Sequence, residues 1–256
     1  MTDLAEVAEI VDTAAKTARS IEQLSLSGHD LNLDEAYAVQ ALSIGRRVAR
    51  GERMVGIKMG FTSRAKMIQM GLDEMIWGRL TDAMRLEDGT TLDMADYVHP
   101  RVEPEIAYIL KKPLSGPVTL AEALAAVEAI APAMEIIDSR YRNFKFNLAD
   151  VVADNSSSSS FVLGPMHKPD IDASNLGMTM SFNGRAVQTG SSAAILGNPA
   201  RSLAAASRLA GEAGLELKPG WIIMAGGATA AEALDPGTAV KLAVEHLGNV
   251  SFKTKR

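Results

Sequence analysis

The predicted elements of this chain do not alternate regularly between strand and helix. The last third instead resembles a β-meander, with a strand at 178–182, the turn residues Asn183-Gly184 and a return strand at 186–189. Asn-Gly between two such runs is a strong signal for a type I′ hairpin turn. A helix beginning at Pro199 follows, and then strands at 221–225, 239–244 and 250–252. This order excludes a doubly wound nucleotide-binding fold and predicts an α+β protein with a mixed, largely antiparallel sheet.

The first fifty residues have a different character, since their apolar residues recur at helical spacing. One amphipathic helix is predicted over 4–15 and a second from Asn32 to near Gly51, where Asn32 and Glu35 have the spacing of a capping box. We therefore predict a small N-terminal helical lobe, residues 1–52, followed by a β-rich catalytic domain, residues 53–256.

The centre of the chain supplies the remaining predicted elements. Thr62-Ser63 are predicted to cap a short helix that runs to Met70, and Thr119 to open a helix that ends at about Ile130. The polar run 155–160, which contains five consecutive serines, is interpreted as an ordered loop because the apolar residues 161–163 follow it directly. Strands are predicted at 54–60, 102–110 and 133–138.

Composition limits the classes of protein to which the chain can belong. It has 256 residues, 47% hydrophobic and 22% charged, with a net charge of -5 and no cysteine. Disulfides, thiolate nucleophiles and cysteine-ligated zinc are excluded, and the acidic balance argues against nucleic acid as a partner. No recognisable signal segment or membrane span is found, so a cytoplasmic globular protein is expected.

Three glutamates are the strongest candidates for chemistry. In a strand over 102–110, Glu103 and Glu105 lie on one face, while Glu135 interrupts the apolar run 133–137. Neighbouring carboxylates repel each other unless a cation or a proton lies between them, and oxygen donors suit Mg²⁺ or Mn²⁺. The alternative is a solvated pair of acids on the strand, with Glu135 paired to an arginine such as Arg140.

A second candidate is Lys58, in the segment Gly56-Ile57-Lys58-Met59-Gly60. A lysine between apolar residues and flanked by glycines can bind a substrate carboxylate or donate a proton. The alternative is a surface lysine whose aliphatic stem lies over apolar neighbours. Arg140, Asn155 and Ser157 supply further polar groups after the predicted strands, and the four histidines show no ligand spacing.

Four segments occur in an order that resembles a known family. They are Gly56 to Ser63, Val102 to Ala107, Glu135 to Arg140 and Ala153 to Ser158. Together they resemble the 2-oxopent-4-enoate hydratase and 4-oxalocrotonate decarboxylase family of the fumarylacetoacetate hydrolase superfamily. The segments 58–71 and 138–146 look more like the decarboxylase branch. The serine run 156–160 departs modestly from the family pattern.

The resemblance implies a fold, a reaction and roles for the candidate residues. It implies a fumarylacetoacetate hydrolase-type β core, and metal-dependent decarboxylation of 2-oxo-3-hexenedioate to 2-hydroxypenta-2,4-dienoate in the meta-cleavage degradation of aromatic compounds. The metal ligands would be Glu103, Glu105 and Glu135, with Lys58 catalytic. Arg140, Asn155 and Ser157 would orient the substrate.

The resemblance also implies a homo-oligomer, associated with a hydratase. Two alternatives to the decarboxylase are kept. The first is a 2-oxopent-4-enoate hydratase, which would bind the dienol product in the same pose and add water to it. The second is a scaffold or metabolite-binding subunit without catalysis, against which the intact acids and Lys58 argue.

Overall fold

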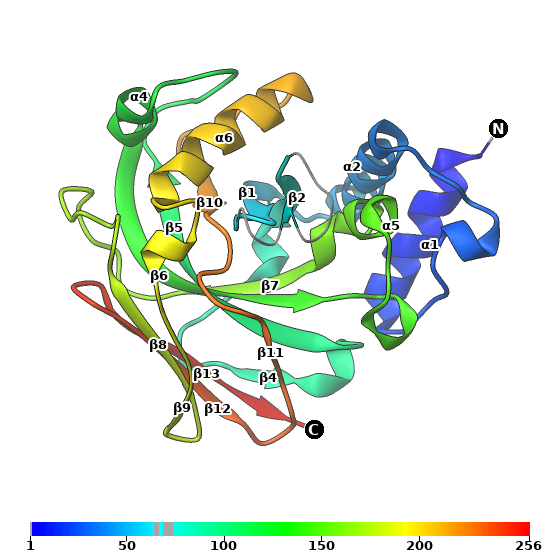
Figure 1. Ribbon diagram of the computed structural model, residues 1–256. Coiled ribbons are helices and arrows are strands. Elements are labelled where there is room, and N and C mark those ends of the chain that lie inside the picture. Colours follow the sequence, from blue (N-terminus) through cyan, green and yellow to red (C-terminus); the bar gives the residue numbers. More distant parts are fainter. Residues whose placement is uncertain (1, 64–66, 69–73) are drawn as a thin grey trace.

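The computed structural model describes residues 2–63, 67–68 and 74–256 and shows two β-sheets with helices around them (Figure 1). The larger sheet has eight strands, seven of them in the order β2-β1-β10-β5-β6-β7-β3, with β11 pairing beside β5. Its strands are β1 (Met54–Gly60), β2 (Ile76–Thr81), β3 (Arg85–Leu86), β5 (Pro100–Leu110), β6 (Val127–Asp138), β7 (Ser158–Leu163), β10 (Ile222–Met224) and β11 (Glu232–Ala233). The α+β prediction with a mixed sheet is confirmed, because parallel pairs such as β1–β10 occur among antiparallel ones.

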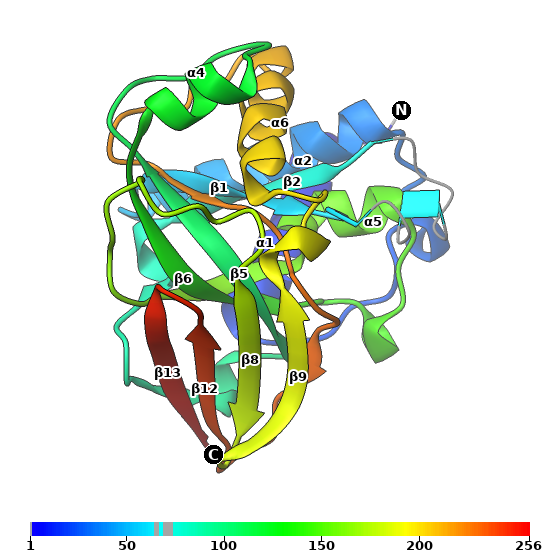
Figure 2. The ribbon, with the colours of Figure 1, turned by 60° about the vertical axis from the view of Figure 1, so that its left-hand side comes forward.

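The smaller sheet has five strands in the order β4-β13-β12-β8-β9. Its strands are β4 (Thr91–Asp93), β8 (Gly177–Phe182), β9 (Arg185–Ser191), β12 (Ala239–Val244) and β13 (Gly248–Lys255). The predicted hairpin joins β8 to β9, with Asn183 at φ 51° and Gly184 at φ 81°. Figure 2 shows four of these strands side by side next to the long strands β5 and β6. Apolar residues of both sheets share one core cluster, which includes Ile106, Met134, Met180 and Leu242.

The helices are α1 (Leu4–Thr17), α2 (Leu33–Ala49), α4 (Leu120–Ala125), α5 (Leu148–Ala153) and α6 (Pro199–Glu212). The capping box at the start of α2 forms as predicted, with Asn32 accepting from Glu35 N and the Glu35 carboxylate accepting from Asn32 N. Helices α1, α2 and α5 lie together at one end of the molecule (Figure 1). Val7, Val39 and Val152 belong to one apolar cluster, together with Tyr141. The boundary at residue 52 stays a prediction.

Two details of the predicted elements are wrong. The helix opened by Thr119 ends at Ala125, because Val127 already begins β6 and packs into the core. The run 155–160 is not a loop throughout, because Ser158 already begins β7, which pairs with β6. The predicted helix from Thr62 to Met70 lies largely outside the described residues. Within the described ranges, no helix is both long and apolar enough to cross a membrane.

The antiparallel pair β5–β6 positions the predicted acids. Glu103 lies opposite Glu135 in the register, and Glu105 lies opposite Ala133. Since side chains two apart share a face, both acids of β5 and the acid of β6 extend toward the same side of the sheet.

Candidate metal centre and active site

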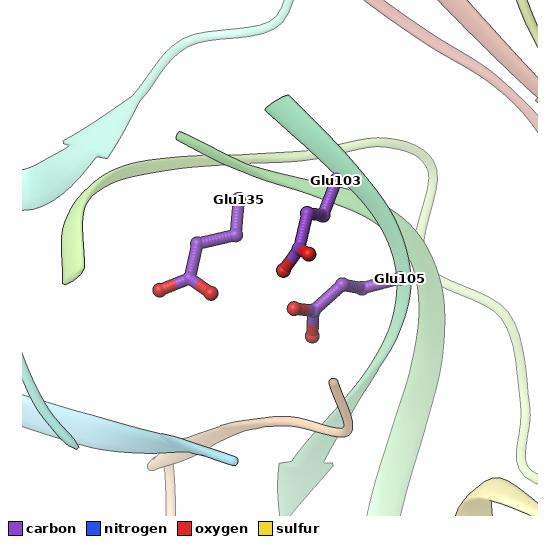
Figure 3. Close-up of side chains that lie close together, drawn as sticks. All are labelled: Glu103, Glu105 and Glu135. Atoms are coloured by element: carbon purple, nitrogen blue, oxygen red, sulfur yellow. The ribbon is translucent and has the colours of Figure 1, made fainter. Parts of the chain in front are cut away.

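The side chains of Glu103, Glu105 and Glu135 converge in the structure (Figure 3). Each offers one carboxylate oxygen, and these three atoms lie within 4.8 Å of one another. Glu105 and Glu135 are completely buried, whereas Glu103 is half-buried. The sequence prediction placed two of these acids on one strand face, and the β5–β6 register adds the third.

The hydrogen-bonding state of the two buried acids fits a bound cation. Glu105 Oε2 accepts a 2.7 Å hydrogen bond from Gly226 N. In the described part of the chain, Oε1 of Glu105 and Oε1 of Glu135 have no hydrogen-bond partner. Buried carboxylate oxygens without partners are costly, and a hard divalent cation such as Mg²⁺ or Mn²⁺ would satisfy them. The donor set, which is all oxygen, suits either ion.

The raised pKa of Glu105 is also consistent with a cation site. Burial raises the pKa of Glu105 well above its usual range, and the charges of Glu135 and Glu103 raise this pKa further. Lys58 and the Gly226 N–H lower the pKa, but by less. A carboxyl group in this environment would exchange its proton for a metal ion, as expected of a metal ligand.

Lys58 is buried beside these acids and is not a surface lysine. It is 3% exposed, and its Nζ lies 3.2 Å from Glu135 Oε2. Strand β1 places it there, since Lys58 is paired with Met224 on one side and with Gly78 on the other. The partner of Glu135 is therefore Lys58, where the sequence had suggested Arg140.

Ser157 belongs to a turn in an unusual backbone conformation. Asn155, Ser156 and Ser157 have φ values of 50°, 51° and 58°. Three consecutive non-glycine residues in the left-handed region cost free energy, and such residues concentrate at functional sites. Ser157 Oγ is buried without a hydrogen-bond partner among the described residues, and Ser157 lines the cavity that contains Lys58.

The side chains of Asn155 and Arg140 form hydrogen bonds with other residues of the chain. Asn155 Oδ1 accepts from Arg79 N at 2.7 Å, and its Nδ2 donates to Arg79 O at 2.9 Å. Arg140 Nε donates to Asp154 Oδ1 at 2.6 Å, and a second guanidinium nitrogen donates to Asp154 O at 2.9 Å. Burial raises the pKa of Asp154 to about 6, although Arg140 lowers it. Both residues therefore hold the turn, and their contact with substrate stays a prediction.

A cavity of about 120 Å³ opens beside the triad. Its polar lining residues include Lys58, Glu103 and Ser157 together with Thr62 and Ser63. Its apolar lining residues were not found from the sequence, because they come from segments far apart in the chain, among them Phe61, Ile76, Phe144, Phe146 and Val151.

The glycine pair 226–227 is a second feature that was not found from the sequence. A Cβ on Gly227 would lie 2.9 Å from Cδ of Glu103, so a side chain at position 227 would displace that carboxylate. Gly226, at φ 102°, donates to Glu105. The signal available in the sequence was a glycine, Gly226, directly after the predicted strand 221–225.

Comparisons with known proteins agree with this geometry. Residues 58–254 match the family described as fumarylacetoacetate (FAA) hydrolase C-terminal. A 4-oxalocrotonate decarboxylase of a Pseudomonas species is 58% identical over 252 residues, covering 98% of each chain. A 2-keto-4-pentenoate hydratase of Paraburkholderia xenovorans (strain LB400) is 35% identical, covering 96% of this chain and 92% of the relative.

A solved structure is also similar along almost its whole length. It is 4-oxalocrotonate decarboxylase from Pseudomonas putida G7, complexed with magnesium and adipate. The TM-score is 0.95 at 38% identity, with 98% of this chain and 97% of the other covered.

Proposed function

The chain belongs to the fumarylacetoacetate hydrolase family, and from that premise we propose that it is a divalent-metal-dependent decarboxylase of 2-oxo-3-hexenedioate. The products are CO₂ and 2-hydroxypenta-2,4-dienoate. The observation that carries the proposal is the agreement between the buried acid triad and the 58% identity to a 4-oxalocrotonate decarboxylase over 98% of both chains. Relatives named as hydratases are less similar, at 34–38% identity.

The reaction needs a place for the electrons that the departing carboxylate leaves behind. When the C5–C6 bond breaks, its electron pair forms the C4–C5 double bond. The C3–C4 pair shifts to C2–C3, and the carbonyl pair moves onto the 2-oxo oxygen. An Mg²⁺ or Mn²⁺ ion held by Glu103, Glu105 and Glu135 would supply Lewis-acid stabilisation of that oxygen and of the neighbouring C1 carboxylate.

We assign Lys58 to the same oxygen. Its ammonium group is buried next to Glu135 and lines the cavity, so that it can add positive charge where the enolate develops. It can also deliver the proton that converts the enolate to the dienol product. Its 3.2 Å contact with Glu135 fixes the direction of the side chain before substrate binds.

We assign Ser157 to substrate binding and give Arg140 and Asn155 an indirect role. Burying a hydroxyl without a partner is unfavourable, and a substrate carboxylate oxygen in the cavity would satisfy the Ser157 group. Arg140 acts through Asp154, and Asn155 through the backbone of Arg79, by holding the turn in its strained conformation.

The test is to mix the protein with Mg²⁺ and 2-oxo-3-hexenedioate and to follow CO₂ release together with the ultraviolet absorbance of the dienol. Metal-dependent CO₂ release is expected, and removal of the metal with a chelator should abolish it. Consumption of separately supplied 2-hydroxypenta-2,4-dienoate without CO₂ release would make the protein a hydratase. No reaction with either compound would contradict both readings.

We further infer that the chain assembles with copies of itself and operates beside a hydratase. Leu33 and Val48, which lie on the same side of α2, are 42% and 44% exposed, and a partner surface would remove them from water. Light scattering should give a mass above that of one chain. A monomer that also fails to co-elute with a hydratase would contradict the inference.

A further inference from the structure

We propose that Gln40, on helix α2, is a positioning residue for the active-site turn 155–157, and that α2 thereby contributes to substrate binding. The proposal rests on the proposed function, because it concerns the placement of Ser157, which we assign to the substrate. Gln40 is completely buried and is not among the described residues that line the cavity beside the triad. Its effect on the substrate must therefore pass through other residues.

Strand β2 lies at the edge of the larger sheet, and the turn binds that edge. In an antiparallel strand, every second residue directs its N–H and C=O to the same edge, and at an outer edge these groups have no strand partner. In β2 these residues are Trp77 and Arg79. The Asn155 side chain binds both backbone groups of Arg79, at 2.7 and 2.9 Å. Ser156 Oγ donates to Trp77 O at 2.8 Å, so the edge of β2 holds the turn.

Gln40 connects three groups around this turn. Its Nε2 donates to Trp77 O at 3.1 Å, which is the oxygen that Ser156 also binds. The same nitrogen donates at 2.9 Å to Val152 O, one of the last carbonyl groups of α5, which ends two residues before the turn. Gln40 Oε1 accepts from the guanidinium of Arg79. One side chain therefore joins the strand that holds the turn to the helix that precedes it.

The amide group of Gln40 matches the chemistry of its partners. The carbonyls of Trp77 and Val152 need donors and the Arg79 guanidinium needs an acceptor, so Nε2 faces the carbonyls and Oε1 faces Arg79. Burial lowers the pKa of Arg79 to about 10, and the group still carries its charge at neutral pH. A carboxylate at position 40 could not donate to the carbonyls. An apolar side chain would leave buried polar groups without this partner, at a cost in free energy.

Helix α2 also binds β2 one turn before Gln40. Tyr37 Oη accepts from Trp77 N at 3.3 Å, and the two rings stack with their centroids 5.3 Å apart. Residues three apart lie on the same face of a helix, so Tyr37 and Gln40 together bind the N–H and the C=O of Trp77. The helix thus fixes the position of this edge strand.

The position of β2 and of the turn decides how two cavity residues are placed. Gly78 of β2 pairs with Lys58, and the turn carries Ser157; both Lys58 and Ser157 line the cavity. The turn has three consecutive non-glycine residues in the left-handed region, a conformation that persists only where its surroundings impose it. Loss of the Gln40 hydrogen bonds would allow the turn to relax and would displace the Ser157 hydroxyl from the substrate.

The test asks whether the effect of Gln40 passes through Ser157. Gln40→Met removes all three hydrogen bonds at similar size, whereas Gln40→Glu keeps the acceptor for Arg79 and loses both donors. Ser157→Ala and the double variant with Gln40→Met complete a double-mutant cycle. With Mg²⁺ present, calorimetry would measure the binding of 2-oxoadipate. This acid is saturated at C3–C4 and cannot lose CO₂ by the proposed route.

Gln23→Met is the matched control. Gln23 is half-buried near the same helices, and its side chain forms no hydrogen bond within the described ranges of the chain. Titration with Mn²⁺ gives a second readout, because the triad lies on β5 and β6 and shares no hydrogen bond with Gln40 among the described residues. An unchanged Mn²⁺ affinity would show that a variant is folded around its metal site.

We expect both Gln40 variants to weaken 2-oxoadipate binding roughly tenfold and to lower kcat/KM by about 10–100-fold. Mn²⁺ affinity should stay within about twofold of that of the unaltered protein. In the Ser157→Ala background no hydroxyl is left to misplace, so Gln40→Met should weaken 2-oxoadipate binding by less than about twofold more. Gln23→Met should change none of these quantities.

The proposal is overturned if the losses from Gln40→Met and Ser157→Ala multiply in the double variant, because Gln40 would then act independently of Ser157. A parallel loss of Mn²⁺ affinity would overturn it as well, since it would indicate a general loss of structure. So would 2-oxoadipate binding within about twofold of the original in both Gln40 variants.

The binding measurements do not depend on turnover, so the two proposals fail separately. If the Gln40 and Ser157 effects are coupled but the unaltered protein releases no CO₂ from 2-oxo-3-hexenedioate, the positioning role stands and the proposed function is wrong. If CO₂ is released but the effects are not coupled, the proposed function stands and the role of Gln40 is wrong.

Discussion

At Glu105, burial and two neighbouring carboxylates act on one side chain in the same direction. The pKa of this group lies well above 4.5, so the metal-free protein retains a proton where an ordinary glutamate is ionised. A metal ion must displace that proton, and its affinity should therefore rise with pH, by at most about tenfold per pH unit for one proton. The rise should level off once the pH exceeds the pKa of the metal-free site.

Calorimetric titration with Mn²⁺ between pH 5 and 8, in buffers with different ionisation enthalpies, would measure both the affinity and the protons released. Glu105→Gln is the control, because it keeps the size of the side chain but has no proton to release. An affinity that does not change over this range, with no proton release, would contradict the assignment of Glu105 as a ligand.

Lys58 is the residue at which catalysis and metal binding can be separated. Lys58→Met should lower kcat by about 10²–10⁴, the usual contribution of a positioned proton donor. It should leave Mn²⁺ affinity undiminished, because the lysine is a cation beside the ligand Glu135 and contributes no ligand atom. Steady-state kinetics and metal titration would test this, with the exposed Lys112→Met as control. Loss of metal binding in Lys58→Met would assign the residue to the structure of the metal site.

At the scale of the elements, β2 lies between β1, with which it pairs, and the turn 155–157, which it contacts. Gly78 is paired with Lys58 in β1, and a Cβ on Gly78 would lie 2.6 Å from the backbone oxygen of Asn155. Gly78→Ala must therefore displace the turn that carries Ser157. Displacement by about 1 Å near a reacting group can reduce the rate about 10²-fold, so we expect kcat/KM to fall by about 10–100-fold.

Gly45→Ala is the matched control for this change. Gly45 lies within α2 and has no atom within 4 Å of an added Cβ. Replacing a helical glycine should stabilise the protein by about 0.5–1 kcal/mol and leave kcat/KM unchanged. Thermal unfolding and kinetics of both variants would check the comparison. Full activity in Gly78→Ala would show that the position of the turn has no effect on the reaction.

For the whole molecule, metal binding at the triad should raise the free energy of unfolding. The acids on β5 and β6 repel one another in the centre of the larger sheet, and the ion that relieves this repulsion binds only the folded chain. Mg²⁺ at about 100 times its Kd should add about 2.7 kcal/mol to the free energy of unfolding. For a chain of this size, the melting temperature should rise by roughly 5–10 °C.

Glu105→Gln should stabilise the metal-free protein and remove the stabilisation by Mg²⁺. The metal-free variant should melt above the unaltered protein at pH 8, because a group with a raised pKa in the folded state destabilises the fold above its usual pKa, and a neutral amide does not titrate. Its melting temperature should no longer respond to Mg²⁺. Differential scanning calorimetry with and without Mg²⁺ would measure both effects, and an unchanged response to Mg²⁺ would contradict the triad as a metal site.

Much of the fold was predictable because its signals are local. The capping box of Asn32 and Glu35, the Asn183-Gly184 turn and the alternation along β5 each depend on residues a few positions apart. The same alternation indicated that Glu103 and Glu105 share a face. Local signals failed where the tertiary structure outweighed them, as at the helix that ends at Ala125 because Val127 is required in the core.

The sequence by itself determined the α+β class, the candidate acids and the lysine, because residue type and short-range periodicity are written directly in the chain. Only the tertiary structure decided which groups meet. Pairing of β5 with β6 set Glu103 opposite Glu135, and β1 brought Lys58 to that acid while Arg140 bound Asp154. The cavity lining likewise gathers Phe61, Phe144 and other apolar residues from distant segments. Such contacts depend on strand register and packing across the whole core, for which no local pattern carries a signal.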